Sequence, residues 1–218
     1  MFKRNANIGR ELRISSWRRS ALAIWRTAYD PSIYTWDEFD IAPAQAYMER
    51  IARESGLRIT LTHFVSKAVA EMIRRHPEMN VLRRGGSLYP RDTIDLSYTV
   101  ASDGRGEDLG AAIVYDAASK SMAEISRELQ PVVKEVKAHR DPRHQGFKKV
   151  LSLLPHRLRC LVLDVTTWIL YDLNLWSPVF GLPRNPFGCV LITNIGSLGL
   201  TQGFAALVPA MRIPMVIA

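Results

Sequence analysis

The sequence has few cysteines and no long apolar run, which excludes disulfide-rich scaffolds and membrane-spanning helices. Of its 218 residues only Cys160 and Cys189 are cysteines, and they form neither a Cys-x-x-Cys pair nor a disulfide framework. Charged residues and a proline interrupt the most apolar region, 147–176, well short of the ~20 apolar residues that a spanning helix needs. No apolar segment follows the charged N-terminus, so we expect no signal peptide and a cytoplasmic protein.

The sequence also lacks the usual patterns of metal ligands. None of its five histidines stands in a His-Glu-x-x-His pattern, and neither cysteine has a histidine or a basic residue positioned by the sequence to mark a nucleophile. We therefore expect no metal site and expect both cysteines to pack in the core. His63 and His76 lie at the two ends of one expected helix and are the histidines to weigh for acid–base chemistry.

The positive charge is concentrated near the N-terminus. The formal net charge is +8, of which residues 1–29 supply +6. Such a segment suits nucleic acid, anionic lipid or an acidic neighbouring subunit. Because no zinc-finger spacing or RNA-binding signature accompanies it, we do not expect nucleic acid. We divide the chain into a basic N-terminal arm, 1–15, and one domain, 16–218.

Hydrophobic residues make up 47% of the chain and charged residues 23%, which is typical of a globular domain. Expected helices and strands intermix without a regular strand–helix–strand alternation, and this favours an α+β fold. We expect helices over 16–29, 43–55, 61–76 (capped by Thr60), a stretch from a Ser119 or Ser121 cap to about 139, and one or two within 147–176. We expect strands over 32–41, 92–101, 109–115, 189–195 and 213–218, and a hairpin over 81–89.

The segment 192–199, Ile-Thr-Asn-Ile-Gly-Ser-Leu-Gly, is the strongest chemical cue. It places the Thr193 hydroxyl and the Asn194 amide at a strand end, where such groups can donate hydrogen bonds to a developing oxyanion. The alternative is an ordinary strand and turn, in which Gly196 and Gly199 supply positive φ angles. Residue spacing alone favours the ordinary turn.

Two further segments have a functional and a structural interpretation. Residues 103–106, Asp-Gly-Arg-Gly, look like a phosphate-binding loop but lack the lysine spacing and the following helix, so a hairpin turn is the better interpretation. Residues 158–171 could form a membrane-surface helix, although one packed on a sheet explains their sparse lysines better.

Several stretches together resemble the catalytic domain of dihydrolipoamide acyltransferase, the acyltransferase component of 2-oxo acid dehydrogenase complexes. This domain shares its fold with chloramphenicol acetyltransferase. Each stretch is weak alone, but their order and spacing are those of the family, and the resemblance covers about 16–218. The stretches are Ser-Trp-Arg-Arg-Ser-Ala-Leu-Ala (16–23), Thr-His-Phe-Val-Ser-Lys-Ala-Val-Ala (62–70), His-Pro-Glu-Met-Asn (76–80), Asp-Leu-Ser-Tyr-Thr-Val-Ala (95–101), Lys-Ser-Met-Ala-Glu-Ile-Ser (120–126) and Thr-Asn-Ile-Gly (193–196).

The resemblance implies a chloramphenicol-acetyltransferase-like two-layer sandwich of mixed sheet and helices, assembled as a homotrimer or a higher homo-oligomer. It implies coenzyme A as co-substrate and a channel between subunits that coenzyme A and a dihydrolipoyl group enter from opposite ends. The hydroxyl of Thr193 matches the family's oxyanion-binding position, and Asn194 matches the neighbouring position that shapes the turn. A histidine in a His-x-x-x-Asp-Gly motif is the family's general base.

The sequence departs from the family at four places. No histidine here has an aspartate four residues on followed by glycine, and the family's motif would come after the strand that 213–218 matches. We therefore expect a domain that is incomplete at the C-terminus, and two explanations stay open: either the natural chain continues past Ala218 or the family's base is absent. The segment 102–113 differs from the family's pattern, 147–187 is a hydrophobic insertion, and no lipoyl or peripheral-subunit-binding domain is visible.

These observations leave two functions open. The first is a coenzyme-A-dependent acyltransferase that passes an acyl group to a thiol or another acceptor, on a lipoyl-bearing or other protein. The second is a catalytically inactive scaffold or acyl-CoA-binding subunit, because the motif histidine is absent. A weaker third hypothesis is peripheral membrane contact through the basic arm and the insertion.

Overall fold

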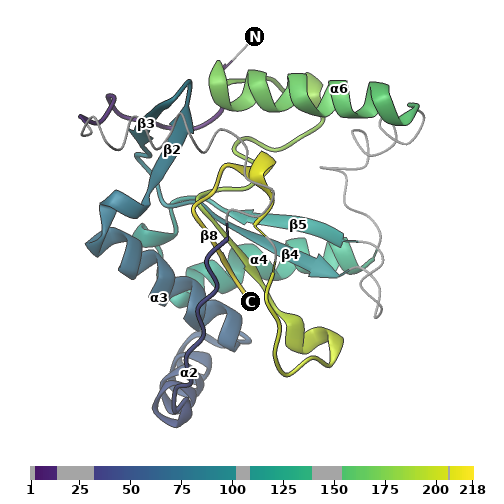
Figure 1. Ribbon diagram of the computed structural model, residues 1–218. Helices are drawn as coiled ribbons and strands as arrows, with labels where there is room; N and C mark the ends of the chain where they lie inside the picture. The colour runs from purple at the N-terminus through teal and green to yellow at the C-terminus, as the bar shows by residue number, and fades with distance from the viewer. Residues whose placement is uncertain (1–2, 14–31, 102–108, 139–153, 206) are drawn as a thin grey trace.

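The computed structural model of the chain describes residues 3–13, 32–101, 109–138, 154–205 and 207–218. In these ranges helices and strands combine around a central four-stranded sheet, which confirms the predicted α+β class (Figure 1). The expected helix over 16–29, the turn over 103–106 and the polar loop that follows residue 138 lie outside the described residues.

The central sheet has the strand order β5-β4-β7-β8. Its strands are β4 (Leu96–Ala101), β5 (Leu109–Val114), β7 (Val190–Thr193) and β8 (Met215–Ile217). β4 and β5 form an antiparallel hairpin, whereas β7 runs parallel to both β4 and β8. All four strands were predicted, but each is shorter than expected, because the residues at their ends lie in turns or in the loops that connect them.

Two helices, α3 (Leu61–Arg75) and α4 (Met122–Lys137), cover one face of the sheet. Alternate residues of β4 point toward them, and Leu96, Tyr98 and Val100 are at most 8% exposed. They pack with residues of both helices, namely Ala70, Ile73, Ile125 and Leu129. Burial of this apolar surface is the main favourable contribution to folding.

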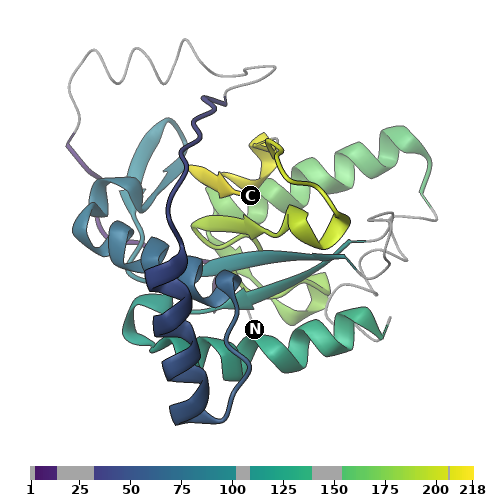
Figure 2. The ribbon, with the colours of Figure 1, turned by 90° about the horizontal axis from the view of Figure 1, so that it is seen from below.

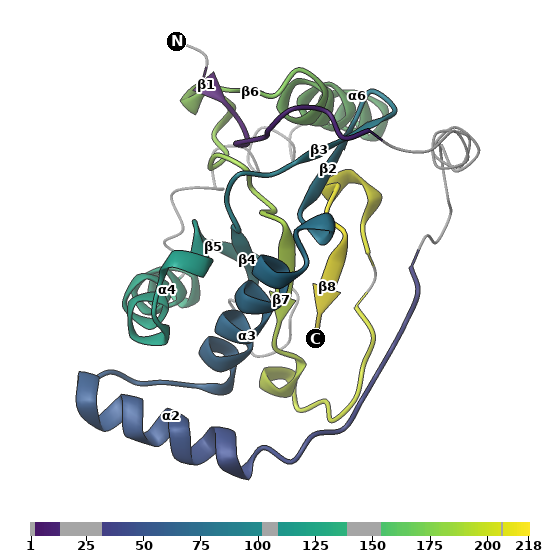
Figure 3. The same ribbon diagram turned by 90° about the vertical axis from the view of Figure 1, so that its left-hand side faces the viewer.

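The helix caps follow the sequence. The Ser121 hydroxyl accepts a hydrogen bond from the Glu124 backbone N–H, and the Glu124 carboxylate accepts one from the Ser121 N–H, so Ser121 and not Ser119 caps α4. The helix continues through Pro131. The predicted helix that ends at Gly56 is α2 (Ala42–Ser55), which lies outside α3 and α4 (Figure 3).

The predicted strand over 32–41 is wrong. The segment is irregular, and Ile33, Trp36 and Phe39 are 92%, 73% and 77% exposed. Its alternation places apolar residues in both rows of side chains, so neither row could be buried as a face. No other described segment forms a strand ladder with it, so it lacks the hydrogen-bonding neighbour that a strand requires.

Residues close to the N-terminus pack with residues 170–176 at one edge of the described structure. β1 (Lys3–Arg4) pairs with β6 (Leu175–Trp176). Ala6 and Ile8 share a small core with Leu170, Tyr171 and Leu82. The remaining elements are the predicted hairpin β2–β3 (Val81–Arg84 and Ser87–Pro90), α6 (His156–Thr167), the π-helical η3 (Trp168–Asp172) and the 3-10 turns η1 (Pro77–Met79), η2 (Ala117–Ser119), η4 (Pro178–Phe180), η5 (Ile195–Leu198) and η6 (Pro209–Met211). No helix in the described ranges is long and apolar enough to cross a bilayer.

A buried polar network closes the sheet where β4 begins. The Asn185 amide donates to the Asp95 carboxylate over 2.8 Å and accepts from the Arg91 guanidinium over 3.2 Å. The backbone N–H of Asp116 donates to the other Asp95 oxygen. Gly188 completes this corner with a φ of +59°, and a Cβ there would lie 2.2 Å from the Asp95 carbonyl oxygen. Burial lowers the pKa of Arg91, and the nearby Asp95 charge opposes that change.

The opposite face of the sheet is closed at the same end and open toward the other. The Ser97 hydroxyl is buried and donates to the carbonyl of Phe187 over 2.8 Å. Leu191 and Val216, which are in register with Ser97, are half-buried, and so are the residues of this face one step farther along the strands, namely Thr99, Ala111 and Thr193. Polar side chains at the carboxyl ends of β4 and β7 are therefore accessible.

Candidate functional site

Thr193 is the last residue of β7 and lies on the open face of the sheet. It pairs in register with Thr99 of the parallel strand β4, so two hydroxyl-bearing side chains stand beside each other on that face. Both residues are half-buried. The sequence indicated Thr193 but gave no sign of Thr99, because the register of a parallel pair is fixed by tertiary packing.

The chain turns sharply after Thr193. Asn194 is extended, with φ −116° and ψ 94°, and the 3-10 turn η5 follows it. Gly199 ends the turn with a φ of +76°, as expected, but Gly196 does not have a positive φ. Gly196 is instead in close contact with Asn194, because a Cβ on it would lie 3.2 Å from the Asn194 side-chain oxygen. The turn therefore holds Asn194 at the end of the sheet.

The first turn of α3 lies next to this strand end. The Asn194 side-chain nitrogen is 3.5 Å from the Thr62 hydroxyl oxygen. Two hydrogen bonds connect Thr62 to the core. The Ser66 hydroxyl donates to the Thr62 carbonyl over 2.5 Å, and the Tyr98 hydroxyl donates to Ser66 Oγ over 2.9 Å. Burial raises the pKa of Tyr98 to about 12, so this hydroxyl keeps its proton and serves as a donor. Thr62 is a site neighbour that the sequence did not single out.

His63 is close to this region in the chain, yet its bonding pattern does not suit a general base. Its Nδ1 accepts a hydrogen bond from the Thr60 backbone N–H over 3.0 Å, in the manner of a capping box. The neutral ring therefore carries its proton on Nε2 and has no free lone pair. Burial, helped by the nearby Arg58 charge, lowers the pKa of His63 to about 4. The side chain caps α3 as a neutral acceptor.

The remaining histidines and cysteines do not add a nucleophile to this end of the sheet. His76 is exposed beside Glu78, and the side chain of His156 lies outside the described residues, as do His139 and His144. Cys189 is buried as predicted, and burial raises its thiol pKa to about 12. Cys160 was predicted to be in the core, but it is exposed on α6, because that helix does not pack on the sheet.

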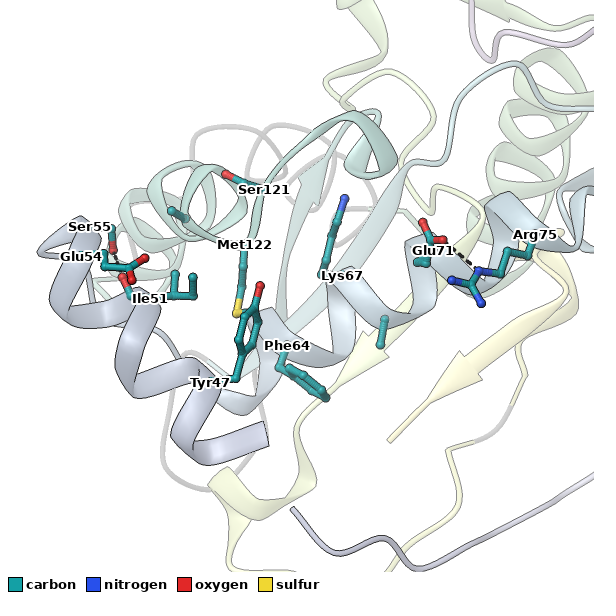
Figure 4. Close-up of a pocket in the computed structure, with 12 residues that line it drawn as sticks. Tyr47, Ile51, Glu54, Ser55, Phe64, Lys67, Glu71, Arg75, Ser121 and Met122 are labelled. Carbon is teal, nitrogen blue, oxygen red and sulfur yellow. Dashed lines mark hydrogen bonds and ion pairs between the residues drawn. The ribbon is translucent and has the colours of Figure 1, made fainter. Parts of the chain in front are cut away.

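A pocket of about 710 Å³ lies between α2, α3 and the start of α4 (Figure 4). Apolar side chains from all three helices, Tyr47, Phe64 and Met122 among them, line it with Lys67 and Glu71. Phe64, Lys67 and Glu71 are spaced along one side of α3, whereas Thr62 and Ser66 are on the side that faces the sheet. The helix therefore separates this pocket from Thr193.

A second pocket, of about 720 Å³, lies beside the buried polar network. Lys3, Asp95, Trp176 and Arg184 are among its lining residues. It is at the beginning of β4, whereas Thr193 stands beside Thr99 near its end. Within the described ranges no group of three or more His, Cys, Asp or Glu residues could hold a metal ion.

Comparison with protein families gives one match that covers most of the chain. The model of the 2-oxoacid dehydrogenases acyltransferase (catalytic domain) family matches residues 11–145. The lipoamide acyltransferase component of the branched-chain alpha-keto acid dehydrogenase complex of Bacillus subtilis is 25% identical over 49% of this chain. The succinyltransferase component of the 2-oxoglutarate dehydrogenase complex of Haemophilus influenzae is 28% identical over 46% of it. The matched regions span only 26% and 25% of these relatives.

Solved structures of similar fold cover more of the chain. A probable dihydrolipoamide acetyltransferase from Listeria monocytogenes superposes with a TM-score of 0.55 over 95% of this chain and 73% of its own, at 16% identity. The dihydrolipoamide acetyltransferase of Azotobacter vinelandii gives a TM-score of 0.56 over 95% and 71%, at 12% identity. At such identities the likeness concerns the fold alone.

Proposed function

Since the chain belongs to the family of 2-oxoacid dehydrogenase acyltransferases, matched over the catalytic domain, we propose that it transfers an acyl group between coenzyme A and a thiol acceptor. In this proposal the Thr193 hydroxyl donates a hydrogen bond to the oxyanion of the tetrahedral intermediate. The observation that carries it is the position of Thr193, half-buried at the end of β7 on the open face of the sheet.

The geometry suits an oxyanion donor in three respects. The hydroxyl sits on a strand whose backbone is fixed by neighbours on both sides, so its direction is set before a substrate arrives. Half-burial lowers the local dielectric and strengthens a hydrogen bond to a negative oxygen. The turn over Asn194 and Gly196 leaves the strand end accessible to a thioester.

In the proposed reaction the acyl group passes from the sulfur of coenzyme A to the sulfur of the acceptor. The acceptor thiol loses its proton to a base, and its sulfur forms a bond to the thioester carbonyl carbon of acyl-CoA. The carbonyl oxygen takes the electron pair and is stabilised by Thr193. The intermediate collapses, the bond between the carbonyl carbon and the coenzyme A sulfur breaks, and the departing thiolate is protonated by the conjugate acid of the base.

The proposal places the base outside the residues that the structure describes. Of the two histidines whose side chains are described, His63 has its acceptor nitrogen occupied by the helix cap, and His76 is exposed beside Glu78 at the far end of α3. The half-exposed sheet face around Thr193 supports a site completed by another subunit, which agrees with the oligomer that the family resemblance implies. A homotrimer and a lipoyl-bearing acceptor are therefore part of the proposal.

The test is acyl transfer from acetyl-CoA to dihydrolipoamide, measured by thiol release with the full protein. Thr193→Ala should lower kcat by about 10²-fold, whereas Thr193→Ser should retain most of the activity because it keeps the hydroxyl. Thr99→Ala removes the neighbouring hydroxyl on the same face and serves as the matched control, with turnover close to wild type. Equal loss in the Thr99 and Thr193 variants would contradict the assignment of the oxyanion donor to Thr193.

A second candidate is an acyl-CoA-binding subunit that does not catalyse transfer. The observation in its favour concerns His63, the one buried histidine among the described side chains. Its Nδ1 lone pair accepts a hydrogen bond in the helix cap and is therefore not available to take a proton from a thiol. This candidate predicts saturable acetyl-CoA binding in calorimetry, with no thiol release above background. Any transfer that disappears in Thr193→Ala would exclude it.

A further inference from the structure

The helix α6 stands apart from the rest of the domain. It lies at the opposite end of the molecule from α2 (Figures 1 and 2), along the edge that also carries β1 (Figure 3). Its main contacts are with η3, which continues the same helix, and there Leu170 and Tyr171 anchor it in the small core. The family match ends at residue 145, so α6 lies outside the part of the chain that the family model covers.

One side of α6 is an exposed apolar stripe. Leu158, Leu161, Val165 and Trp168 follow one another at intervals of three or four residues, which places them on one side of the helix. They are 44%, 57%, 44% and 52% exposed. Isolated exposed apolar residues are normal, but a contiguous stripe of this kind marks a surface that binds another apolar surface.

Basic residues flank both ends of this stripe. Arg157 and Arg159 are exposed in the first turn of α6. At its other end β1 brings in the exposed residues Lys3 and Arg4, because β1 pairs with β6 and β6 contacts η3. The acidic residue on the described part of the helix is Asp164. The surface of an anionic lipid bilayer is complementary to this pattern. The apolar stripe would contact the acyl chains, the cations would lie among the negative headgroups, and Trp168 would lie at the interface between the two.

The same charges oppose the pairing of two α6 stripes. A second copy laid on the stripe would bring two sets of Arg157, Arg159, Lys3 and Arg4 together with one acid each, and like charges in contact cost binding energy. An anionic bilayer offers the opposite sign over a wide area, and each Lys or Arg near such a surface favours binding.

We propose that α6 docks in the plane of an anionic lipid bilayer through Leu158, Leu161, Val165 and Trp168, with the flanking cations on the lipid headgroups. The helix lies on the surface and does not cross it. Lipid docking is independent of acyl transfer, and the site around Thr193 is on a different element, so each proposal can fail without the other.

The experiment is co-sedimentation of the full protein with vesicles of phosphatidylcholine alone, or of phosphatidylcholine and phosphatidylglycerol in equal parts. The protein should bind the mixed vesicles, and binding should weaken in high salt because salt screens the charges. Trp168→Glu and Leu161→Glu should abolish binding. Arg157→Gln, which leaves the stripe intact, should weaken it by about fivefold. Trp36→Glu is the matched control, since Trp36 is more exposed, at 73%, but belongs to the segment that leads into α2.

Three outcomes would overturn the proposal. Binding to neither kind of vesicle would assign the stripe to a protein partner. Trp36→Glu reducing binding as much as Trp168→Glu would move the contact away from α6. A smaller particle mass for Leu161→Glu in light scattering without lipid would make the stripe a contact between copies of the chain. Thermal unfolding of each variant, unchanged from wild type, verifies that the substituted side chains were exposed.

Discussion

The two ends of the paired strands β4 and β7 have opposite characters. Where the strands begin, Asp95, Asn185 and Arg91 are buried and hydrogen-bonded to one another. Where they end, Thr193 is half-buried and Asn194 is exposed, with its side-chain nitrogen 3.5 Å from the Thr62 hydroxyl oxygen. The hydrogen-bonded end fixes the sheet, and in our proposal the accessible Thr193 hydroxyl at the other end contacts the substrate. Groups whose hydrogen bonds are already made stabilise a fold, whereas groups with capacity to spare can do chemistry.

The largest effect is expected from Gly188→Ala at the closed end. Gly188 has a φ of +59°, and a Cβ would lie 2.2 Å from the backbone carbonyl oxygen of Asp95, so the backbone itself must move. We expect the free energy of unfolding to fall by more than about 3 kcal/mol in urea denaturation. Gly85→Ala is the control, because Gly85 has a similar φ of +54° with no atom near the added Cβ, and it should cost about 1 kcal/mol. Equal losses would mean that the close approach of Gly188 to Asp95 is not important.

Asparagine-to-alanine substitutions at the two ends compare them directly. Asn185→Ala removes both the acceptor of Arg91 and the donor to Asp95, and leaves two buried charged groups without their bridge. We expect a loss of about 3 kcal/mol in unfolding free energy. Asn194→Ala removes an exposed side chain and should change stability by less than about 0.5 kcal/mol. A larger loss of unfolding free energy in Asn194→Ala than in Asn185→Ala would contradict the contrast between a closed and an open end.

An effect that is absent at neutral pH and appears only in acid concerns His63 beside the open end. The pKa of His63 is about 4 in the fold against 6.5 for a free side chain. Below pH 6.5 the His63 side chain of the unfolded chain therefore becomes protonated, whereas in the folded protein it stays neutral down to about pH 4. Stability falls as the pH drops through this window, by at most about 1.4 kcal/mol per pH unit.

His63→Gln isolates that contribution, because glutamine can hold the capping box but does not titrate. Urea unfolding of both proteins between pH 7 and pH 4 should show a shallower pH dependence for the variant. The acyl-transfer pH profile should be unchanged, because His63 is not the base. A changed profile would return His63 to the catalytic candidates.

Local features of the fold could be predicted from sequence. Ser121 with Glu124 three residues on, and Gly56 after a helical stretch, are signals read within one turn of chain. The segment 32–41 was misassigned because extended backbone becomes a strand only with a partner, and the partner is a tertiary property. Cys160 was misplaced for a related reason, since the apolar pattern of α6 indicates a buried side but not what would cover it.

The candidate site was predictable only in part. A hydroxyl at a strand end before a glycine turn pointed to Thr193 in the sequence. The sequence pointed to Asn194 as well, but it could not reveal Thr62, because Thr62 and Asn194 are separated by 132 residues. His63 was noticed as a possible acid–base group, but its capping role depends on Nδ1 facing the Thr60 N–H, which only the three-dimensional structure reveals.

The most direct test measures turnover and unfolding free energy together for Thr193→Ala. The predicted result is a kcat about 10²-fold lower, with stability within about 0.5 kcal/mol of wild type. Asn185→Ala should show the opposite pattern, with stability lost and, at temperatures where it stays folded, turnover retained. Undiminished turnover in Thr193→Ala, or a loss of activity explained by unfolding, would contradict the account of a reactive open end.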